Sequence, residues 1–358
     1  MRDILQDKWS REFINSNRKN ILHITMRVGK CRIGIKIFSL LEEELKREPK
    51  ILICYPDKNI ENSWKEEFKK CKYENSNIEF CTHISLHKIT KNKYDIIVID
   101  EIHLLSENQK KNLNKLLSNN KKSSILGLSG TLSQKTKTEL YEDCGLDVLV
   151  NYSLEDAVKD KIISDYRIHI IKTELDNSII KDHKKKRTEK QIYKAYTWVI
   201  ENKGPSLILN LSRMRIIHNS ISRLKAVKKI LEKLKDKRVL IFCANNKIAK
   251  ELGCKIHTSK INNQDFFDKF KDGKGSKHLA VCKIGNTGTS FHNLNHIVIQ
   301  AFDSNSENLT QRIARSLILE KESDISHIYI VISREKAELN WLSKSLEFFN
   351  KEKIKFYE

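Results

Sequence analysis

The stretch Tyr94-Asp95-Ile96-Ile97-Val98-Ile99-Asp100-Glu101-Ile102-His103 decides the fold expected for the first part of this chain. A β-branched apolar run of this length predicts a strand buried on both faces of a parallel sheet. The two carboxylates then lie at the carboxyl end of that strand, where open α/β sheets bind their ligands. Asp100 can hold Mg²⁺ there and Glu101 can polarise a water molecule, so the stretch indicates nucleotide hydrolysis if a phosphate cradle exists.

A candidate phosphate cradle lies upstream, at Thr25-Met26-Arg27-Val28-Gly29-Lys30-Cys31. It falls between a strand-like run at residues 21–24 and an amphipathic helical pattern that begins at residue 33. Backbone N–H groups at such a strand-to-helix turn hold phosphates, and the lysine reaches the β and γ oxygens. Of the pattern G-x-x-x-x-G-K-[ST], only Gly29 and Lys30 are matched. This short match indicates a nucleotide site because the two carboxylates follow downstream.

The hydroxyl position of that pattern is occupied by Cys31. A Ser or Thr hydroxyl is a hard oxygen ligand for Mg²⁺, whereas a thiol is soft and a poor match. We therefore expect either weakened metal binding or a water molecule that stands in for the hydroxyl.

The composition describes a globular protein with a strong positive charge. The chain has 358 residues, 39% hydrophobic and 32% charged, with a formal net charge of +21 and a pI near 9.5. This excess favours a polyanionic partner, although an AT-rich genome would also inflate lysine. No apolar run approaches a membrane span, the start lacks a signal-peptide core, and the eight cysteines form no CxxC pair. A reduced cytoplasmic setting without disulfides or zinc ribbons is expected.

Strand-like and helix-like segments alternate in two blocks, which predicts an α/β fold with two parallel, helix-covered sheets. The predicted strands are residues 21–24, 51–54, 78–81, 94–100 and 124–128, then 239–243, 280–282, 297–299 and 328–332. Helical patterns include residues 309–319 and 335–349. The expected division is a first domain at residues 1–150, a connecting segment with basic and helical stretches at 151–235, and a second domain at 236–358.

With these residues in place, the chain resembles the superfamily 2 helicases of the DExH type over nearly its whole length. Gly29-Lys30 looks like motif I, Asp100 to His103 like motif II, and Ser129-Gly130-Thr131 like motif III. Residues 51–56 followed by Trp64 are similar to motif Ia, and residues 82–85 fall at motif Ib. In the second half, residues 239–244, 280–299 and 311–315 look like motifs IV, V and VI.

The resemblance implies two tandem RecA-like domains of the P-loop NTPase fold, an ATP-binding one and a C-terminal helicase one. It further implies a set of site residues. ATP would contact Val28, Gly29, Lys30, Cys31 and the adenine-reading Gln6, with Mg²⁺ on Asp100. Catalysis would use Lys30, Asp100, Glu101, Gln311 and Arg315, and coupling would use His103, Ser129 and Thr131. Nucleic acid would contact Pro56, Thr82, Thr287 and Thr289. For Gln6, an ordinary polar residue near a frayed terminus is the equal alternative.

Three positions depart from the family pattern. Besides Cys31, Ala314 replaces the glycine of motif VI, and Ile318 stands where a second arginine is usual. Because an arginine finger stabilises charge developing on the γ-phosphate, its loss can slow hydrolysis by several powers of ten. An active but slow ATPase is expected, in which Arg315 contacts the γ-phosphate.

The resemblance favours a phage-type DNA helicase of the UvsW-like or restriction-translocase-like branch. The expected partner is nucleic acid, with DNA favoured over RNA. The protein is expected to act as a monomer on the nucleic acid and to have no membrane partner. If the protein is viral, it would act in the host cytoplasm. Two alternatives stay open: a non-catalytic nucleic-acid-binding protein on a decayed helicase scaffold, and a switch ATPase that clamps without unwinding.

Overall fold

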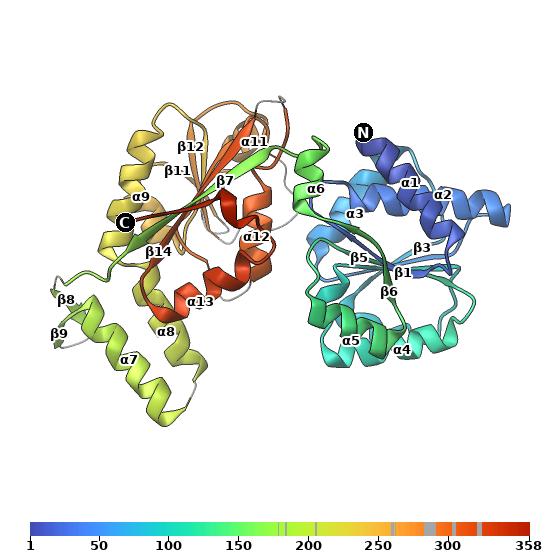
Figure 1. The fold of residues 1–358 in the computed structure, drawn as a ribbon, viewed down its shortest axis with the longest axis horizontal. Helices are drawn as coiled ribbons and strands as arrows, with labels where there is room; N and C mark the ends of the chain where they lie inside the picture. Colours follow the sequence, from blue (N-terminus) through green and yellow to red (C-terminus); the bar gives the residue numbers. More distant parts are fainter. Residues whose placement is uncertain are drawn as a thin grey trace. The chain divides into compact units, whose positions relative to one another are not determined.

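The computed structural model describes residues 1–358 except 178, 183–184, 205, 259–260, 262, 283–290, 303–305 and 321–323. The chain divides into two compact units, Met1–Ile163 and Ser164–Glu358. Each unit contains a parallel sheet with helices beside it (Figure 1), which confirms the predicted α/β class.

The first unit is built on a six-stranded parallel sheet in the order β3-β2-β4-β5-β1-β6. Its strands are β1 (Lys19–Ile24), β2 (Ile51–Tyr55), β3 (Ile78–Thr82), β4 (Ile96–Asp100), β5 (Ser124–Ser129) and β6 (Asp147–Tyr152). Its helices are α1 (Arg2–Asn15), α2 (Lys30–Leu45), α3 (Lys58–Cys71), α4 (Glu107–Asn119), α5 (Gln134–Cys144) and α6 (Leu154–Lys159), with short 3₁₀ turns η1 (His83–Lys88) and η2 (Ile102–Leu104).

Helices cover both faces of this sheet, with α1, α2 and α3 on one side and α4 and α5 on the other (Figure 1). Strand β4 is buried along its whole length, as its β-branched run predicts. Ile97 and Ile99 share a core with Leu113 and Leu116 of α4. Because side chains alternate along a strand, Asp100 projects toward the opposite layer, which contains α2 and α3.

The second unit is built on a seven-stranded parallel sheet in the order β11-β12-β10-β13-β14-β7-β15. Its strands are β7 (Asp165–Thr173), β10 (Val239–Phe242), β11 (Lys255–Thr258), β12 (His278–Cys282), β13 (His296–Ile299), β14 (Ile325–Ser333) and β15 (Ile354–Tyr357). The helices that accompany this sheet are α9 (Ile221–Lys233), α10 (Asn246–Glu251), α11 (Gln264–Lys271), α12 (Ser306–Ala314) and α13 (Lys336–Ser345), and η3 (Lys351–Lys353) precedes β15.

A smaller subdomain projects from the second sheet (Figure 1). It consists of the antiparallel pair β8 (Ile179–Asp182) and β9 (Lys185–Thr188), followed by helices α7 (Glu189–Lys203) and α8 (Leu207–His218). Thr188 begins α7 with a capping box that it forms with Gln191.

The structure draws the domain boundary elsewhere than the predicted positions 150 and 235. β6 and α6 extend the first unit to Ile163, and β7 belongs to the second sheet, where it pairs with β14 along all nine residues. Most of the expected connecting segment is therefore part of the second unit. Pairing between strands so distant in sequence leaves no mark on local hydrophobic periodicity, so the sequence pattern does not reveal that β7 belongs to the second sheet.

The predicted helix at residues 309–319 ends early, at Ala314. Arg315, Ser316 and Leu317 each donate a backbone N–H to the residue three positions before, as in a tightened 3₁₀ turn. Arg315 thus lies just beyond the helix rather than within it.

A fully buried ion pair joins α9 to α13 in the second unit. Arg223 and Glu338 have no exposed side-chain surface and are hydrogen-bonded to each other. Arg223 also donates to the backbone oxygen of Gln300, 3.0 Å away, and Glu338 accepts from the backbone N–H of Ser333 at 2.7 Å. These contacts tie the ends of β13 and β14 to the two helices.

Over the described part of the chain, no helix is long and apolar enough to cross a lipid bilayer.

Candidate functional site

The motif residues of the first unit converge because three neighbouring strands end at the same edge of the sheet. β5 lies between β4 and β1, with Asp100 opposite Leu128 and His23 opposite Ser129. The segments that follow these strands are the candidate phosphate loop, the carboxylate pair and the Ser129–Thr131 turn. Parallel topology therefore places all three at the carboxyl edge, where such sheets bind ligands.

The phosphate loop depends on glycine at position 29. Gly29 adopts a left-handed conformation (φ +95°) immediately before α2, and its carbonyl accepts the N–H of Ile33. A Cβ at this position would lie 2.7 Å from Nε2 of Gln6. A side chain would thus be strained by φ and by contact, so glycine is what allows the Gln6 amide to lie against the loop at the amino end of α2.

Gln6 lies against the phosphate loop instead of fraying with the terminus. It is 1% exposed on helix α1, and its Nε2 donates to the carbonyl of Val28 at 2.7 Å. The alternative of an exposed terminal residue is therefore wrong. Its Oε1 is buried and has no hydrogen-bond partner among the described residues. A buried acceptor without a donor is costly, and the exocyclic amine of an adenine would supply that donor.

Lys30 and the carboxylates form a compact charged group. Nζ of Lys30 lies 3.6 Å from Oε1 of Glu101, and Oε2 of Glu101 accepts the backbone N–H of Gly130 at 3.5 Å. Glu101 has a left-handed backbone (φ +48°). Such strain costs a non-glycine residue about 1–2 kcal/mol and concentrates at functional sites.

The two carboxylates differ in their surroundings. Burial raises the pKa of Asp100, which is 4% exposed, and the nearby charge of Glu101 raises it further. Burial also acts to raise the pKa of Glu101, but Lys30 and then His103 outweigh it and hold this pKa below its usual range. Glu101 is therefore the carboxylate that stays charged most readily without a bound cation.

Sequence reasoning did not find the contact between Trp64 and Asp100. Nε1 of Trp64 donates to Oδ2 of Asp100 at 2.8 Å, and both residues are buried. The sequence resemblance identifies Trp64 only as the residue that trails motif Ia. No local pattern connects two side chains 36 positions apart.

The three residues expected to couple the site to movement meet in one cluster. Nδ1 of His103 lies 2.8 Å from Oγ of Ser129, and its Nε2 lies 3.3 Å from Oγ1 of Thr131. Nδ1 of His103 is also 3.6 Å from Oε2 of Glu101. The cluster thus links the carboxylate to the turn after β5 through one imidazole.

The remaining predicted positions of the first unit lie around this edge. Cys31 is half-buried in the first turn of α2, and burial raises the pKa of its thiol well above the usual value. Pro56 follows β2, and Thr82 ends the neighbouring strand β3, where its hydroxyl donates to Ser85 at 2.9 Å. Both nucleic-acid candidates therefore lie at the carboxyl edge of the sheet.

In the second unit, Gln311 is half-buried on α12 and Arg315 is buried just after it. The neighbouring Arg312 donates from Nη1 to the carbonyl of Ala301 at 2.6 Å. Ile318 is half-buried. Thr287 and Thr289 lie outside the described residues.

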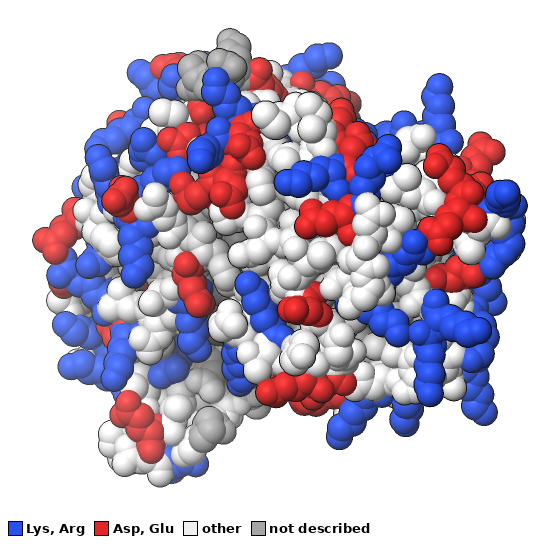
Figure 2. All heavy atoms as spheres, turned by 45° about the vertical axis from the view of Figure 1, so that its right-hand side comes forward, with Lys and Arg blue, Asp and Glu red and all other residues white. Residues whose placement is uncertain are grey.

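Positive charge is spread widely over the face drawn in Figure 2, with acidic side chains among the lysines and arginines. On this face the net charge therefore forms no single continuous basic stripe. It can still raise the rate at which a polyanion is encountered.

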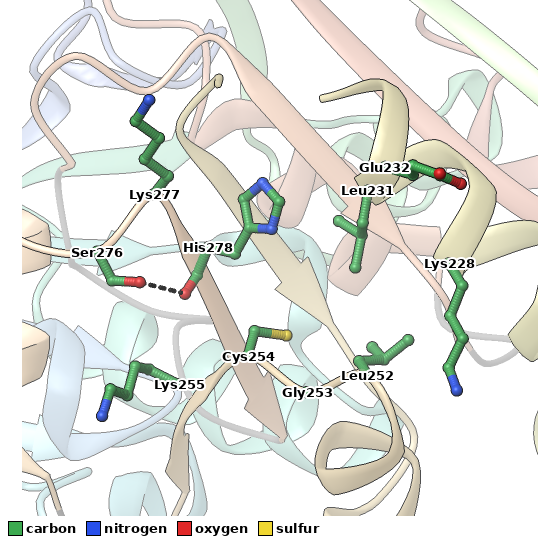
Figure 3. A pocket seen from close by; sticks show the side chains of 10 residues that line it. All are labelled: Lys228, Leu231, Glu232, Leu252, Gly253, Cys254, Lys255, Ser276, Lys277 and His278. Atoms are coloured by element: carbon green, nitrogen blue, oxygen red, sulfur yellow. Dashed lines mark hydrogen bonds between the residues drawn. The ribbon is translucent and has the colours of Figure 1, made fainter. Parts of the chain in front are cut away.

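A pocket of about 640 Å³ lies in the second unit, at the amino ends of β11 and β12 (Figure 3). Leu231, Leu252 and Cys254 line it, and the ammonium groups of Lys228 and Lys277 point away from its centre. Because α/β sheets bind nucleotides at the opposite, carboxyl edge, this pocket is not part of the candidate site.

Family comparisons match both units. Residues 59–140 match the family described as DEAD/DEAH box helicase, and residues 222–317 match the helicase conserved C-terminal domain. One helicase-domain model therefore matches within each unit. Members of this family are typically ATPases that bind ATP with Mg²⁺. No curated protein matches the chain.

Solved structures share the fold at low sequence identity. The chain is similar to S. cerevisiae Dbp5 bound to RNA and ADP BeF3, with a TM-score of 0.61, 10% identity, and coverage of 98% of this chain and 88% of that one. It is also similar to a fragment of a putative HsdR subunit of a type I restriction enzyme from Vibrio vulnificus YJ016 (TM-score 0.62, 15% identity, coverage 99% and 67%). A third similar structure is the Type ISP restriction-modification enzyme LlaBIII bound to DNA (TM-score 0.63, 11% identity, coverage 98% and 30%). The two units are therefore tandem RecA-like domains.

Proposed function

We propose that the chain is an ATP-dependent translocase or helicase that moves on nucleic acid. The observation that carries the proposal is the convergence of Lys30, Glu101 and Gly130 within 3.6 Å at the carboxyl ends of three strands. A protein that only binds nucleic acid has no need for a lysine and a strained carboxylate in this arrangement. The two matched helicase domains supply the context for this site.

The residues present fit ATP with Mg²⁺. The helix amino end at Gly29 suits phosphate oxygens, and the unpaired Oε1 of Gln6 suits an adenine amine. Asp100 would hold Mg²⁺, which in such sites takes one or two protein carboxylates together with phosphates and water. The ion would neutralise charge that develops on the phosphates. Among the residues that the structure describes, no group of three or more His, Cys, Asp or Glu could hold a metal by itself.

The chain's own residues would then perform distinct tasks. Lys30 would bind the β and γ oxygens, and its contact with Glu101 shows that its ammonium reaches the carboxylate edge. Glu101 would orient the attacking water and accept its proton, because it lies beside Lys30 at the edge of the site. Arg315 would stabilise the γ-phosphate from the second unit, and Gln311 would assist it.

His103, Ser129 and Thr131 would transmit the state of the nucleotide. Nδ1 of His103 faces both Glu101 and the Ser129 hydroxyl, and its Nε2 faces the Thr131 hydroxyl. A change in the charge or position of Glu101 after hydrolysis therefore acts directly on the turn after β5. Pro56 and Thr82, with Thr287 and Thr289 from the second unit, would hold the phosphates of the nucleic acid, which carry little sequence information.

DNA is the track that we propose, on the basis of the sequence resemblance to the phage and restriction-translocase branch. The decisive assay is ATP hydrolysis with single-stranded DNA, duplex DNA and single-stranded RNA as stimulants. Stronger stimulation by RNA would refute the choice of DNA while leaving the ATPase assignment intact.

The ATPase itself is tested with Lys30→Ala and Glu101→Gln. Both variants should lose stimulated hydrolysis, whereas Lys69→Ala, at an exposed lysine on α3, should keep it. Equal background hydrolysis by all four proteins would favour the alternative, a binding protein on a decayed scaffold, for which Cys31 and Ile318 are the evidence. Hydrolysis without strand displacement would instead indicate a switch ATPase. If the departures from the family pattern at Cys31 and Ile318 slow ATP hydrolysis, Ile318→Arg should raise the rate of hydrolysis.

A further inference from the structure

We propose that Trp64 is a positioning residue for Asp100: its indole N–H fixes one carboxylate oxygen of the side chain expected to hold Mg²⁺. The proposal rests on the proposed function, since it concerns the same site. Trp64 lies on α3, outside the three segments that form the edge of the site. Its contact with Asp100, 2.8 Å from Nε1 to Oδ2, reaches the site from the helical layer beneath.

The hydrogen bonds of Asp100 define the orientation of its carboxylate. Oδ2 accepts from Trp64, and Oδ1 accepts the backbone N–H of Glu101 at 3.0 Å. With one donor on each oxygen, the plane of the carboxylate is set, and each oxygen retains acceptor capacity for a further ligand. A charged acceptor makes the indole contact stronger than a neutral hydrogen bond.

The indole itself is held rigidly. Trp64 has no exposed surface, and its ring packs against Phe38 and Phe68 with centroid distances of 6.1 and 5.9 Å. Because the ring cannot rotate without displacing this aromatic cluster, the N–H is presented in one direction. Asp100 therefore has a donor placed before any cation binds.

Gly34 makes the position of the indole possible. A Cβ at Gly34 would lie only 2.5 Å from Cη2 of Trp64. Gly34 is one helical turn after Lys30 on α2, so the helix that presents the phosphate-binding lysine also provides the space for the indole. Position 34 thus offers a way to move Trp64 without changing Trp64, Asp100 or the phosphate loop.

A positioning role predicts a specific pattern of defects. Loss of a partner that orients a metal ligand typically costs 10–100-fold in metal affinity or activity. Trp64→Phe should therefore raise the Mg²⁺ concentration for half-maximal ATP hydrolysis at least tenfold. Binding of ATP without Mg²⁺ should stay within twofold, because the phosphate loop is untouched. Gly34→Ala should shift Mg²⁺ dependence in the same direction, and Trp198→Phe, at a tryptophan 58% exposed on α7, should leave it unchanged.

A second measurement needs no activity. In protein labelled with ¹⁵N-tryptophan, the indole signal of Trp64, identified by its loss in Trp64→Phe, should move when Asp100 is changed to Asn and when Mg²⁺ with ATP is added. An unmoved signal, or a Mg²⁺ requirement of Trp64→Phe within twofold of the unchanged protein, would overturn the proposal. If the unchanged protein hydrolyses no ATP, the proposed function fails. The response of the indole signal to Asp100→Asn then still tests whether Trp64 is hydrogen-bonded to Asp100.

Discussion

Breaking the buried pair of Arg223 and Glu338 should destabilise the second unit far more than breaking an exposed pair of the same chemistry destabilises the first. Glu338→Gln keeps the size of the side chain and an acceptor for the N–H of Ser333, but removes the negative charge. Arg223 would then remain charged, with no exposed surface and without its carboxylate. The matched control is Glu44→Gln, which changes the bidentate pair that Glu44 forms with Arg18 at the surface.

The expected magnitudes differ by several-fold. Leaving one partner of a buried ion pair uncompensated costs about 3–5 kcal/mol, whereas an exposed pair contributes about 0–1 kcal/mol. The Glu44 side chain is 48% exposed, and that of Glu338 is 0% exposed. In a domain of this size, each kcal/mol lowers Tm by roughly 2–4 °C. Glu338→Gln should therefore lower the Tm of the second unit by about 6–20 °C, and Glu44→Gln should lower that of the first by about 4 °C or less.

Urea denaturation with calorimetry in parallel measures both changes. The slope of the free energy against urea should stay constant, since the variant exposes the same surface on unfolding. A loss below about 1 kcal/mol for Glu338→Gln, or equal losses for the two variants, would refute the reasoning that burial governs the strength of this pair.

Four further predictions concern the candidate site. Gln6→Ala should reduce the preference for ATP over GTP by up to about tenfold, the value of one hydrogen bond, measured by competition binding. Cys31→Thr should lower the Mg²⁺ requirement of hydrolysis several-fold by providing a hard oxygen ligand, whereas Cys31→Ala should not. Because burial raises the pKa of the Cys31 thiol, the thiol is protonated at neutral pH, and its alkylation should be much slower in the native protein than in urea. His103→Ala should leave hydrolysis within a few-fold and reduce strand displacement at least tenfold; parallel loss of both activities would contradict a coupling role.

The sequence allowed the two sheets and the edge that bears the site to be predicted. Short, isoleucine-rich apolar runs such as residues 51–54 and 96–100 indicate buried strands, because their length and β-branched side chains suit a sheet that is covered on both faces. Gly29 with Lys30 after one strand, and Asp100 with Glu101 after another, were sufficient to place the phosphate loop and the carboxylates at one edge. That the Ser129–Thr131 turn lies beside them follows from the position of β5 between β4 and β1.

Other features could not be predicted from local patterns. The place of β7 in the second sheet depends on its pairing with β14, more than 150 positions away in the sequence. Whether Gln6 frayed or lay against the loop depended on the packing of α1 against α2. The end of α12 at Ala314 also departs from a helical periodicity that continues beyond it.

The sequence by itself determined which residue types stand at the ends of which strands, because hydrophobic periodicity and glycine placement act within a few residues. Only the tertiary structure decided which of these side chains touch. The hydrogen bond from Trp64 to Asp100, the packing of Gln6 on Val28 and the link from His103 to Ser129 each join separate segments. Such contacts form when helices and strands pack, since the geometry of packing, rather than the chemistry of one segment, sets the distance between their side chains.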